Sequence, residues 1–153
     1  MSSRSISHSE SIVCSYILPE QANPAGNAHG GEIMKLMDST GGVVCRRHCH
    51  SNVVTARVDK IDFLHPIRIG NLVTCHGKLT FVGKSSMEVF IRVTVEDLSR
   101  EAPPVDALTG YFTYVALDDN GKPQPVPALE LATEEERHLF EAGRQRYLAT
   151  KKR

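Results

Sequence analysis

The chain has 153 residues, of which 41% are hydrophobic, and its 18 lysines and arginines balance its 18 aspartates and glutamates. This length suffices for one hydrophobic core but hardly for two domains. The balanced charge argues against a general binder of nucleic acids or membrane surfaces, and no apolar run approaches the roughly 20 residues of a membrane-spanning helix. The four cysteines are too sparse for a disulfide framework and the first residues lack a secretory signal, so we expect a cytoplasmic protein.

The first half of the chain predicts a strand, a polar loop and one long helix. Residues Ser11–Leu18 are rich in β-branched and aromatic side chains and are followed by proline, as is typical of a strand. Pro19–His29 carries turn signals and predicts a loop. Gly30–His48 is apolar on nearly every face, which predicts a buried helix. In its middle, Gly41 and Gly42 predict close contact with another backbone, because glycine otherwise costs a helix about 1 kcal/mol.

The second half predicts an antiparallel sheet. Four strand-like stretches are separated by turns or proline-rich loops: Asn52–Phe63, Leu72–Val82, Ser86–Asp97 and Ala107–Leu117. A proline-rich strap follows, and a capping box at residues 133–136 opens a final amphipathic helix. We therefore expect an α+β fold, with a sheet wrapped around one helix over residues 1–128 and a helical extension over residues 129–153. A helix that is apolar on nearly every face needs more apolar surface packed around it than five strands provide, which favours a dimer.

One carboxylate stands out on the predicted central helix. Asp38 lies among apolar residues, and carboxylates are rarely buried without a partner or a chemical role. It is either a general base or nucleophile in a dry site, or a carboxylate that binds a neighbouring strand or faces a groove. The residues alone favour neither interpretation.

The loop and the start of the helix supply further polar groups. Gly30 and Gly31 leave backbone N–H groups at a helix N-terminus, where an oxyanion can bind, although a plain glycine turn is the more common explanation of such a pair. Asn23 can orient a water molecule or polarise a carbonyl, or it forms a turn before a proline. His29 is expected to form hydrogen bonds rather than to catalyse, and we group it with Gly30 as a substrate-binding residue.

Two other patterns carry less chemistry. Four possible metal ligands lie near the end of the helix: Cys45, His48, Cys49 and His50. Their spacing matches no common zinc site, so no metal is expected. The segment from Gly83 lacks the full phosphate-binding loop pattern and joins two strands. Lys84, Ser85 and Ser86 either hold a phosphate there or form a solvated hairpin turn.

The run from Asn23 to Gly31, followed by Ile33–Asp38, resembles the signature of the hotdog-fold acyl-CoA thioesterases. The similar group is the brain-type cytosolic acyl-CoA hydrolases and their single-domain bacterial relatives. The resemblance continues through eight further segments: Arg47–Cys49, Asn52–Ala56, Val58–Phe63, Ser86–Glu88, Tyr111–Val115, Pro125–Pro127, Thr133–Glu136 and Gly143–Tyr147. It therefore covers nearly the whole chain.

This resemblance implies a hotdog fold, hydrolysis of acyl-CoA to fatty acid and CoA without a separate cofactor, and homodimers that commonly assemble three to a hexamer. It also implies that Asn23 and Asp38 form the site from opposite partners of a pair. Since this chain keeps both residues, a homodimer would carry two sites. We expect the Gly31 N–H to hold the oxyanion, Asp38 to activate water or attack directly, and Asn23 to position the water or the carbonyl. The nucleotide is expected near Lys84, Ser85 and Ser86.

Two alternatives remain open. Hydratases of the MaoC type carry an Asp-x-Asn-Pro-x-His motif that resembles residues 21–26, but Gln21 and Gly26 replace its catalytic Asp and His. A non-catalytic acyl-CoA sensor would keep the groove and the glycines. It would need neither Asn23 nor Asp38, so their presence argues against it.

Overall fold

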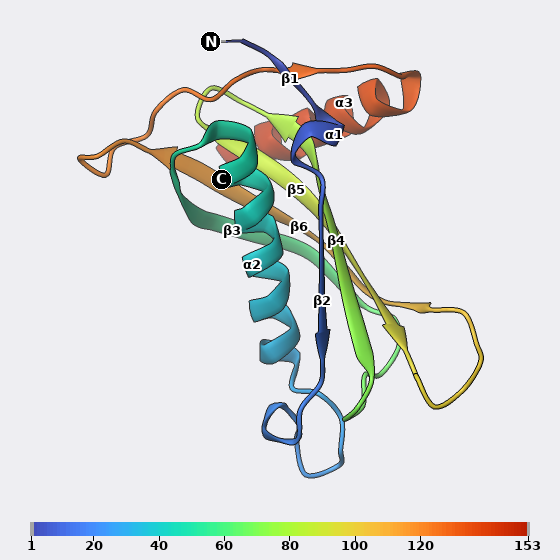
Figure 1. Cartoon of the computed structure of the whole chain (residues 1–153). Coiled ribbons are helices and arrows are strands. Elements are labelled where there is room, and N and C mark those ends of the chain that lie inside the picture. The colour runs from blue at the N-terminus through green and yellow to red at the C-terminus, as the bar shows by residue number, and fades with distance from the viewer. Residues whose placement is uncertain (1, 153) are drawn as a thin grey trace.

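Five antiparallel strands form the main sheet of the computed structural model, which describes residues 2–152 (Figure 1). They are β2 (Ser11–Tyr16), β3 (Asn52–Phe63), β4 (Leu72–Val82), β5 (Ser86–Glu96) and β6 (Val105–Leu117). Their order across the sheet is β2–β4–β5–β6–β3, so β2 and β3 are the two edges. The inner strands alternate buried and more exposed residues along much of their length, because successive side chains of a strand point to opposite faces.

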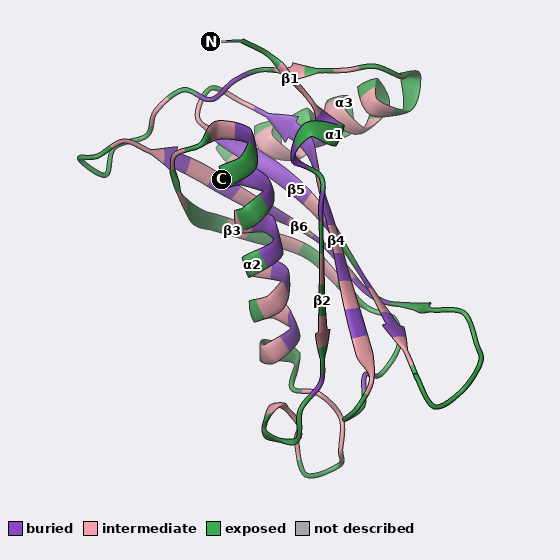
Figure 2. Ribbon diagram, viewed as in Figure 1, coloured by how far each residue is buried: buried purple, intermediate pink, exposed green. Residues whose placement is uncertain are grey.

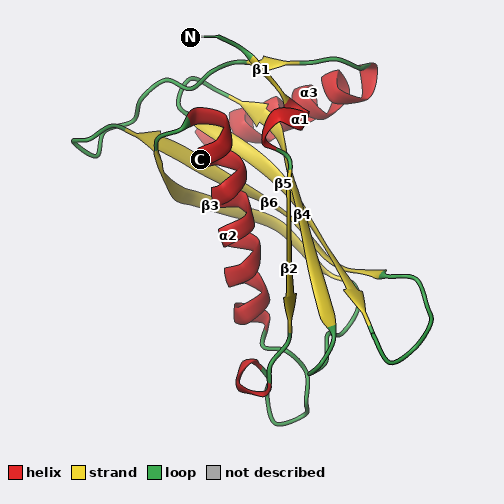
Figure 3. Ribbon diagram, in the orientation of Figure 1, coloured by secondary structure: helices red, strands yellow, loops and turns green. Residues whose placement is uncertain are grey.

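The long helix α2 (Gly30–Cys49) connects the two edge strands and crosses one face of the sheet (Figures 1 and 3). Its residues Ile33, Met37 and Val44 are spaced four and seven positions apart and are almost inaccessible to solvent. They pack into the same core cluster as Phe112 of β6. Burying this stripe against the sheet is what fixes the helix in place.

A second helix, α3 (Glu134–Lys151), covers the opposite face of the sheet. In β5, Met87 and Val89 belong to the core on the α2 side, and Glu88 between them points the other way, where it binds Arg146 of α3. Phe81 of β4 also stacks against two aromatic rings of α3. Figure 2 shows the buried residues concentrated in the strands between the two helices.

Short elements close the structure at both ends of α2. β1 (Arg4–Ser5), the helical turn α1 (Ile6–Ser9) and β7 (Leu129–Glu130) lie beside its C-terminal end, and a 3-10 turn (Pro19–Gln21) lies in the loop before its N-terminus. β1 pairs with β7 in parallel, so the first residues are tied to the proline-rich strap that follows β6. The strap is itself extended along the sheet, where the Val126 N–H donates to the Lys84 oxygen.

The predicted α+β architecture, an antiparallel sheet around one long helix with a C-terminal helix, is confirmed. The predicted bounds of α2 and of the five strands agree within two residues: β2 ends at Tyr16 rather than Leu18, β5 ends at Glu96 rather than Asp97, and β6 begins at Val105 rather than Ala107. Strands end where turn hydrogen bonds replace the ladder, as at Ile17, whose N–H donates to the Asn71 oxygen of another loop. The prediction missed β1, α1 and β7, because their partners are distant in sequence.

α2 is buried on one side only in the single chain, where the five strands leave its other side open. On the open side, Val43 is 40% exposed. The neighbour of Gly41 is a side chain, Tyr114, and not another backbone, while a Cβ on Gly42 would meet nothing within 4 Å. Within residues 2–152, neither α2 nor any other helix is long and apolar enough to cross a membrane.

Candidate active site

Asp38 lies half-buried in the middle of α2, where two hydroxyl groups from the sheet bind its carboxylate. Thr55 Oγ1 donates to Asp38 Oδ1 over 2.7 Å, and Tyr114 Oη donates to the same oxygen over 2.9 Å. Tyr114 Oη also lies 2.8 Å from the backbone oxygen of Asp38. Within residues 2–152 Asp38 Oδ2 has no donor, so one carboxylate oxygen is fixed and the other is free to meet water or a substrate.

The two hydroxyls come from facing positions on neighbouring strands. Thr55 of β3 and Tyr114 of β6 are paired directly opposite each other, and such partners project from the same face of a sheet. The register shifts immediately afterwards, because Ala56 is an extra residue in β3. This β-bulge ends the pairing beside the carboxylate, and bulges commonly re-aim side chains next to active sites.

Burial raises the pKa of the Tyr114 phenol well above its ordinary value, and the hydrogen bond to Asp38 raises it further. Tyr114 therefore remains a neutral donor at any pH at which the protein works. Asp38 is thus hydrogen-bonded to neighbouring strands, as one sequence interpretation held. It also keeps one oxygen available, as the catalytic interpretation requires.

The first turn of α2 presents unpaired backbone donors. Gly30 and Gly31 are exposed, and neither N–H has an acceptor within residues 2–152. His29 is the N-cap residue, but its side chain makes no capping hydrogen bond. The positive end of a helix dipole with free N–H groups attracts anions. A Cβ on Gly31 would meet no heavy atom within 4 Å, so a substrate carbonyl has room to approach.

Asn23 organises the loop that precedes this helix. Its Oδ1 accepts hydrogen bonds from the N–H groups of Ala25, over 3.0 Å, and Asn27, over 3.2 Å. Gly26 completes the turn with a φ of 83°, a left-handed conformation that favours glycine. The turn-forming interpretation of Asn23 is therefore confirmed for its oxygen. Its amide nitrogen has no partner within residues 2–152 and remains available to a ligand.

The structure does not bring Asn23 and Asp38 together within one chain. The hydrogen bonds of Asn23 all stay within its own loop, beyond the N-terminus of α2 (Figure 1). Asp38 lies about 12 Å farther along the helix than Gly30, at 1.5 Å per residue. The helix start and the carboxylate are therefore two separate half-sites in the single chain.

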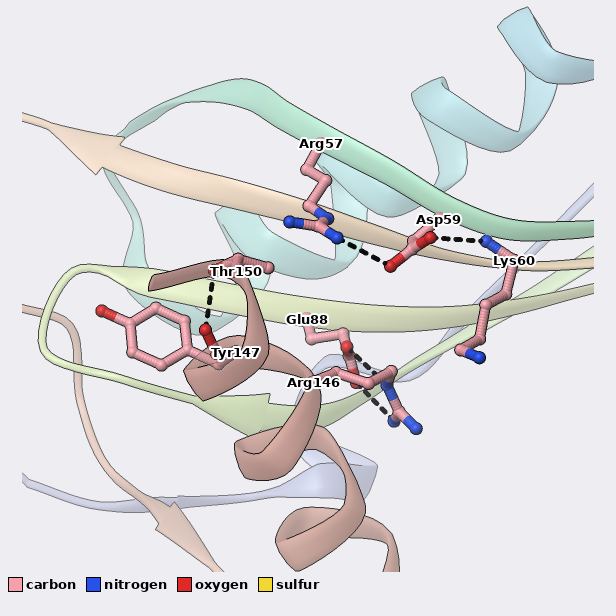
Figure 4. A network of polar contacts seen from close by, with 7 residues as sticks. All are labelled: Arg57, Asp59, Lys60, Glu88, Arg146, Tyr147 and Thr150. Carbon is pink, nitrogen blue, oxygen red and sulfur yellow. Dashed lines mark hydrogen bonds and ion pairs between the residues drawn. The ribbon is translucent and has the colours of Figure 1, made fainter. Parts of the chain in front are cut away.

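Ser85 and Ser86 line a cavity of about 460 Å³ between the sheet and α3, together with Arg57 and Lys151. Figure 4 shows Arg57 paired with Asp59 and, apart from them, the Glu88–Arg146 ion pair that docks α3. The Ser86 hydroxyl is buried and has no hydrogen-bond partner within residues 2–152. Lys84 is exposed and does not line this cavity. The cavity lies on the α3 face of the sheet, so these residues are not gathered with the carboxylate of α2 in one chain.

The four possible metal ligands at the end of α2 do not converge. His48 is buried, and its Nε2 lies 2.7 Å from the Pro127 oxygen; burial lowers its pKa, so the ring is neutral and donates. Cys45 is buried, which raises the pKa of its thiol, and Cys49 instead accepts from the Ser51 hydroxyl. No three potential metal-ligating side chains come together anywhere in residues 2–152.

Thr55 and Tyr114 are the site residues that sequence reasoning missed. Both lie in segments that resemble the thioesterases, but nothing in those segments says which side chains reach Asp38. That depends on the register between β3 and β6 and on which face lies against α2. The signal available in the sequence was Gly41, one turn after Asp38, whose missing side chain makes room for Tyr114.

Comparison with known proteins places these features in a family. The family model of the thioesterase superfamily matches residues 25–102. The mouse cytosolic acyl coenzyme A thioester hydrolase is 41% identical over 147 residues, which are 95% of this chain and 39% of the relative. An acyl-CoA thioester hydrolase of Bacillus subtilis, YkhA, is 39% identical over 138 residues, 90% of this chain and 80% of the relative. The chain thus spans about two fifths of the mammalian relative's length.

Solved structures are similar over almost the whole chain. An apo-hexameric acyl-CoA thioesterase has a TM-score of 0.90 and 33% identity, and covers 99% of this chain and 97% of its own. An acyl-CoA hydrolase from Staphylococcus aureus, solved with butyryl coenzyme A and coenzyme A, has a TM-score of 0.86 and 31% identity, and covers 96% and 89%. Structures of that hydrolase also exist with one Asp, one Thr or one Asn changed to alanine. With the hotdog architecture and the family model in agreement, the chain belongs to the thioesterase superfamily.

Proposed function

We propose that this chain is an acyl-CoA thioesterase, which hydrolyses acyl-CoA to a fatty acid and CoA with Asp38 as its catalytic carboxylate. The observation that carries the proposal is the half-satisfied carboxylate: Thr55 and Tyr114 hold one oxygen and leave the other free. The superfamily and the names of the relatives supply the class of reaction.

The substitutions made in the Staphylococcus aureus hydrolase support the same positions. The Asn and the Asp changed to alanine in that enzyme are 15 positions apart, and the Asp and the Thr are 17 positions apart. Asn23, Asp38 and Thr55 have the same two intervals in this chain. We therefore retain Asn23 and Asp38 as catalytic residues and add Thr55, which orients the carboxylate.

The roles of these groups follow from the charge that develops during thioester hydrolysis. When a nucleophile attacks the carbonyl carbon, the oxygen becomes an anion, which the Gly31 N–H at the positive end of α2 stabilises. The free oxygen of Asp38 either takes a proton from the attacking water or attacks itself, giving an anhydride that water then hydrolyses. Asn23 donates from its free amide to the water or the carbonyl. CoA departs as a thiolate, a good leaving group that needs no strong acid.

The separation of the half-sites within one chain favours a site that two chains build together. Asn23 and Gly31 of one protomer would then face Asp38 of its partner. A homodimer arranged in this way holds two complete sites, each built from Asn23 and Gly31 of one chain and Asp38 of the other. Dimerisation also covers the open side of α2, where Val43 is exposed.

The edge strand β3 is the surface through which such a dimer forms. Val54, Val58 and Phe63 of this strand are all exposed in the single chain. An edge strand with unpaired backbone groups and apolar side chains is a ready template for a second copy. Because the apo-hexameric relative is an assembly of six chains, we infer a trimer of these dimers.

The remaining predicted residues bind two parts of the substrate, its nucleotide and its thioester. Lys84, Ser85 and Ser86 lie on the hairpin between β4 and β5, where hydroxyl and ammonium groups suit phosphates. His29 and Gly30 flank the thioester at the start of α2, and the acyl chain follows the apolar helix. The reaction uses no cofactor other than the CoA of the substrate, and the name of the mammalian relative favours the cytosol.

Thiol release from acetyl-, decanoyl- and palmitoyl-CoA tests the proposal. Wild type, Asp38→Ala and Asn23→Ala are compared, with circular dichroism to confirm folding and Asp119→Ala, an exposed turn carboxylate, as the control. We expect turnover in wild type and Asp119→Ala, and a loss of about 10²-fold or more in the two site variants. Undiminished turnover in Asp38→Ala would move catalysis elsewhere. Tight binding without turnover in wild type would make the protein a sensor.

A further inference from the structure

Tyr114 joins the sheet to α2 at the carboxylate. Its side chain is 2% exposed, and its hydroxyl shares one proton between Oδ1 and the backbone oxygen of Asp38, over 2.9 and 2.8 Å. We infer that Tyr114 is a positioning residue, which orients the catalytic Asp38, and that Gly41 is glycine in order to admit its hydroxyl. This inference rests on the proposed function and names a residue that the comparisons do not.

Gly41 carries the steric part of the argument. It lies one turn after Asp38, on the same side of α2, where residues three positions apart are neighbours. A Cβ on Gly41 would overlap the Tyr114 hydroxyl and lie only 2.8 Å from two carbon atoms of its ring. Every other residue type would therefore push the phenol away. A mid-helix glycine is costly, so its presence here indicates that the approach of Tyr114 matters.

Tyr114 and Thr55 bind the same oxygen but constrain it differently. Thr55 is exposed, and its hydroxyl can rotate towards solvent. The Tyr114 ring is wedged between β6 and the backbone of α2, so its hydroxyl has one direction. Two bonds from Tyr114 fix both the carboxylate and the helical turn that carries it. Asp38 Oδ2 is thereby held in one orientation towards the reacting carbonyl.

The protonation of Tyr114 makes it a donor only. Burial and the neighbouring carboxylate both raise its pKa, so the phenol neither loses its proton nor serves as a base. The titratable groups that act on it, Asp38 and Cys45, both belong to α2, and Thr55 faces it from β3. Tyr114 therefore acts through Asp38 and does not enter the reaction itself.

The test compares kcat and KM of Tyr114→Phe with those of Tyr111→Phe on decanoyl-CoA. Tyr111 lies on the same strand, beneath Arg146 on the other face, and its hydroxyl has no partner within residues 2–152. Removing one hydrogen bond to a charged group should lower kcat about tenfold in Tyr114→Phe, with KM unchanged. Tyr111→Phe should match wild type.

Gly41→Ala gives a second, independent reading, with Gly42→Ala as its matched control. Gly41→Ala should displace the phenol and reproduce the fall in kcat at unchanged KM, whereas Gly42→Ala, which has open space, should not. If Asp38→Ala is inactive while Tyr114→Phe matches Tyr111→Phe in kcat and KM, the inference is overturned and the proposed function stands. If Asp38→Ala keeps wild-type turnover, both fail.

Discussion

Two carboxylates lie on opposite faces of the same sheet, and their partners differ. Both oxygens of Glu88 are bound by Arg146 of α3, over 2.8 and 2.9 Å, and Thr80 donates to one of them over 2.7 Å. Within residues 2–152, Asp38 is bound only by neutral hydroxyls, and only through one oxygen. Glu88 is more deeply buried than Asp38, yet both of its oxygens are already bound, so neither is free to contact a substrate.

The contrast shows that burial alone does not identify a catalytic carboxylate. A carboxylate whose oxygens are all occupied by a cation and a hydroxyl anchors structure, as Glu88 anchors α3. One that is oriented through a single oxygen keeps both its charge and a free lone pair, as a base or nucleophile requires. The two carboxylates should therefore fail in different ways when they are removed.

The largest effect is expected at Asp38, in an experiment that tests whether two chains together build its site. Asn23→Ala and Asp38→Ala chains, each inactive by about 10²-fold or more, are co-expressed with different tags, and the mixed dimer is isolated. If Asn23 of one chain serves Asp38 of the other, one site of the mixed dimer carries both substitutions and the other carries none. We expect thiol release well above that of either parent homodimer.

The parent homodimers, purified through the same two tags, are the control for this complementation. A mixed dimer as inactive as its parents would place both residues of each site in one chain. That outcome would refute the shared site without removing Asp38 from catalysis.

Removing Glu88 should damage stability instead. Glu88→Ala leaves the Arg146 guanidinium largely buried without its anion, which costs about 3 kcal/mol or more of the free energy of unfolding. Urea unfolding followed by circular dichroism measures this loss. The double variant Glu88→Met/Arg146→Met buries no charge and should recover most of the stability. A Glu88→Ala chain as stable as wild type would show that the pair does not anchor α3.

The same contrast explains how much the sequence could predict. Hydrophobic periodicity predicted α2 and the sheet, and the loop signature predicted Asn23, Gly31 and Asp38 as candidates. The sequence could not show that Thr55 and Tyr114 face each other, because strand register and the bulge at Ala56 are tertiary properties. The apolar pattern of α2 indicated that the helix needs more cover than the sheet gives, but it did not show which side of the helix stays open in the single chain.

His48 is intermediate between the two carboxylates, because only one of its ring nitrogens has a partner. Nε2 is bound to the Pro127 oxygen, while Nδ1 is buried with no partner within residues 2–152. Burial lowers the pKa of this ring below its ordinary value of 6.5. Below that pH the unfolded chain takes up a proton that the folded chain still resists, so the free energy of unfolding should fall with decreasing pH. This contribution is fully present above pH 6.5.

His48→Gln tests this expectation, because a glutamine amide can still donate to the strap but cannot be protonated in this range. Thermal unfolding is followed from pH 8 to pH 5 at one protein concentration, since dissociation of an oligomer would otherwise contribute. The variant should start less stable than wild type and lose less stability on acidification, whereas the exposed control His138→Gln should follow wild type. Parallel curves for all three proteins would mean that His48 resists protonation no more in the folded chain than in the unfolded one. The unpaired Nδ1 of His48 would then have no effect on how the free energy of unfolding depends on pH. The difference between Glu88 and Asp38 would in that case come from their binding partners alone.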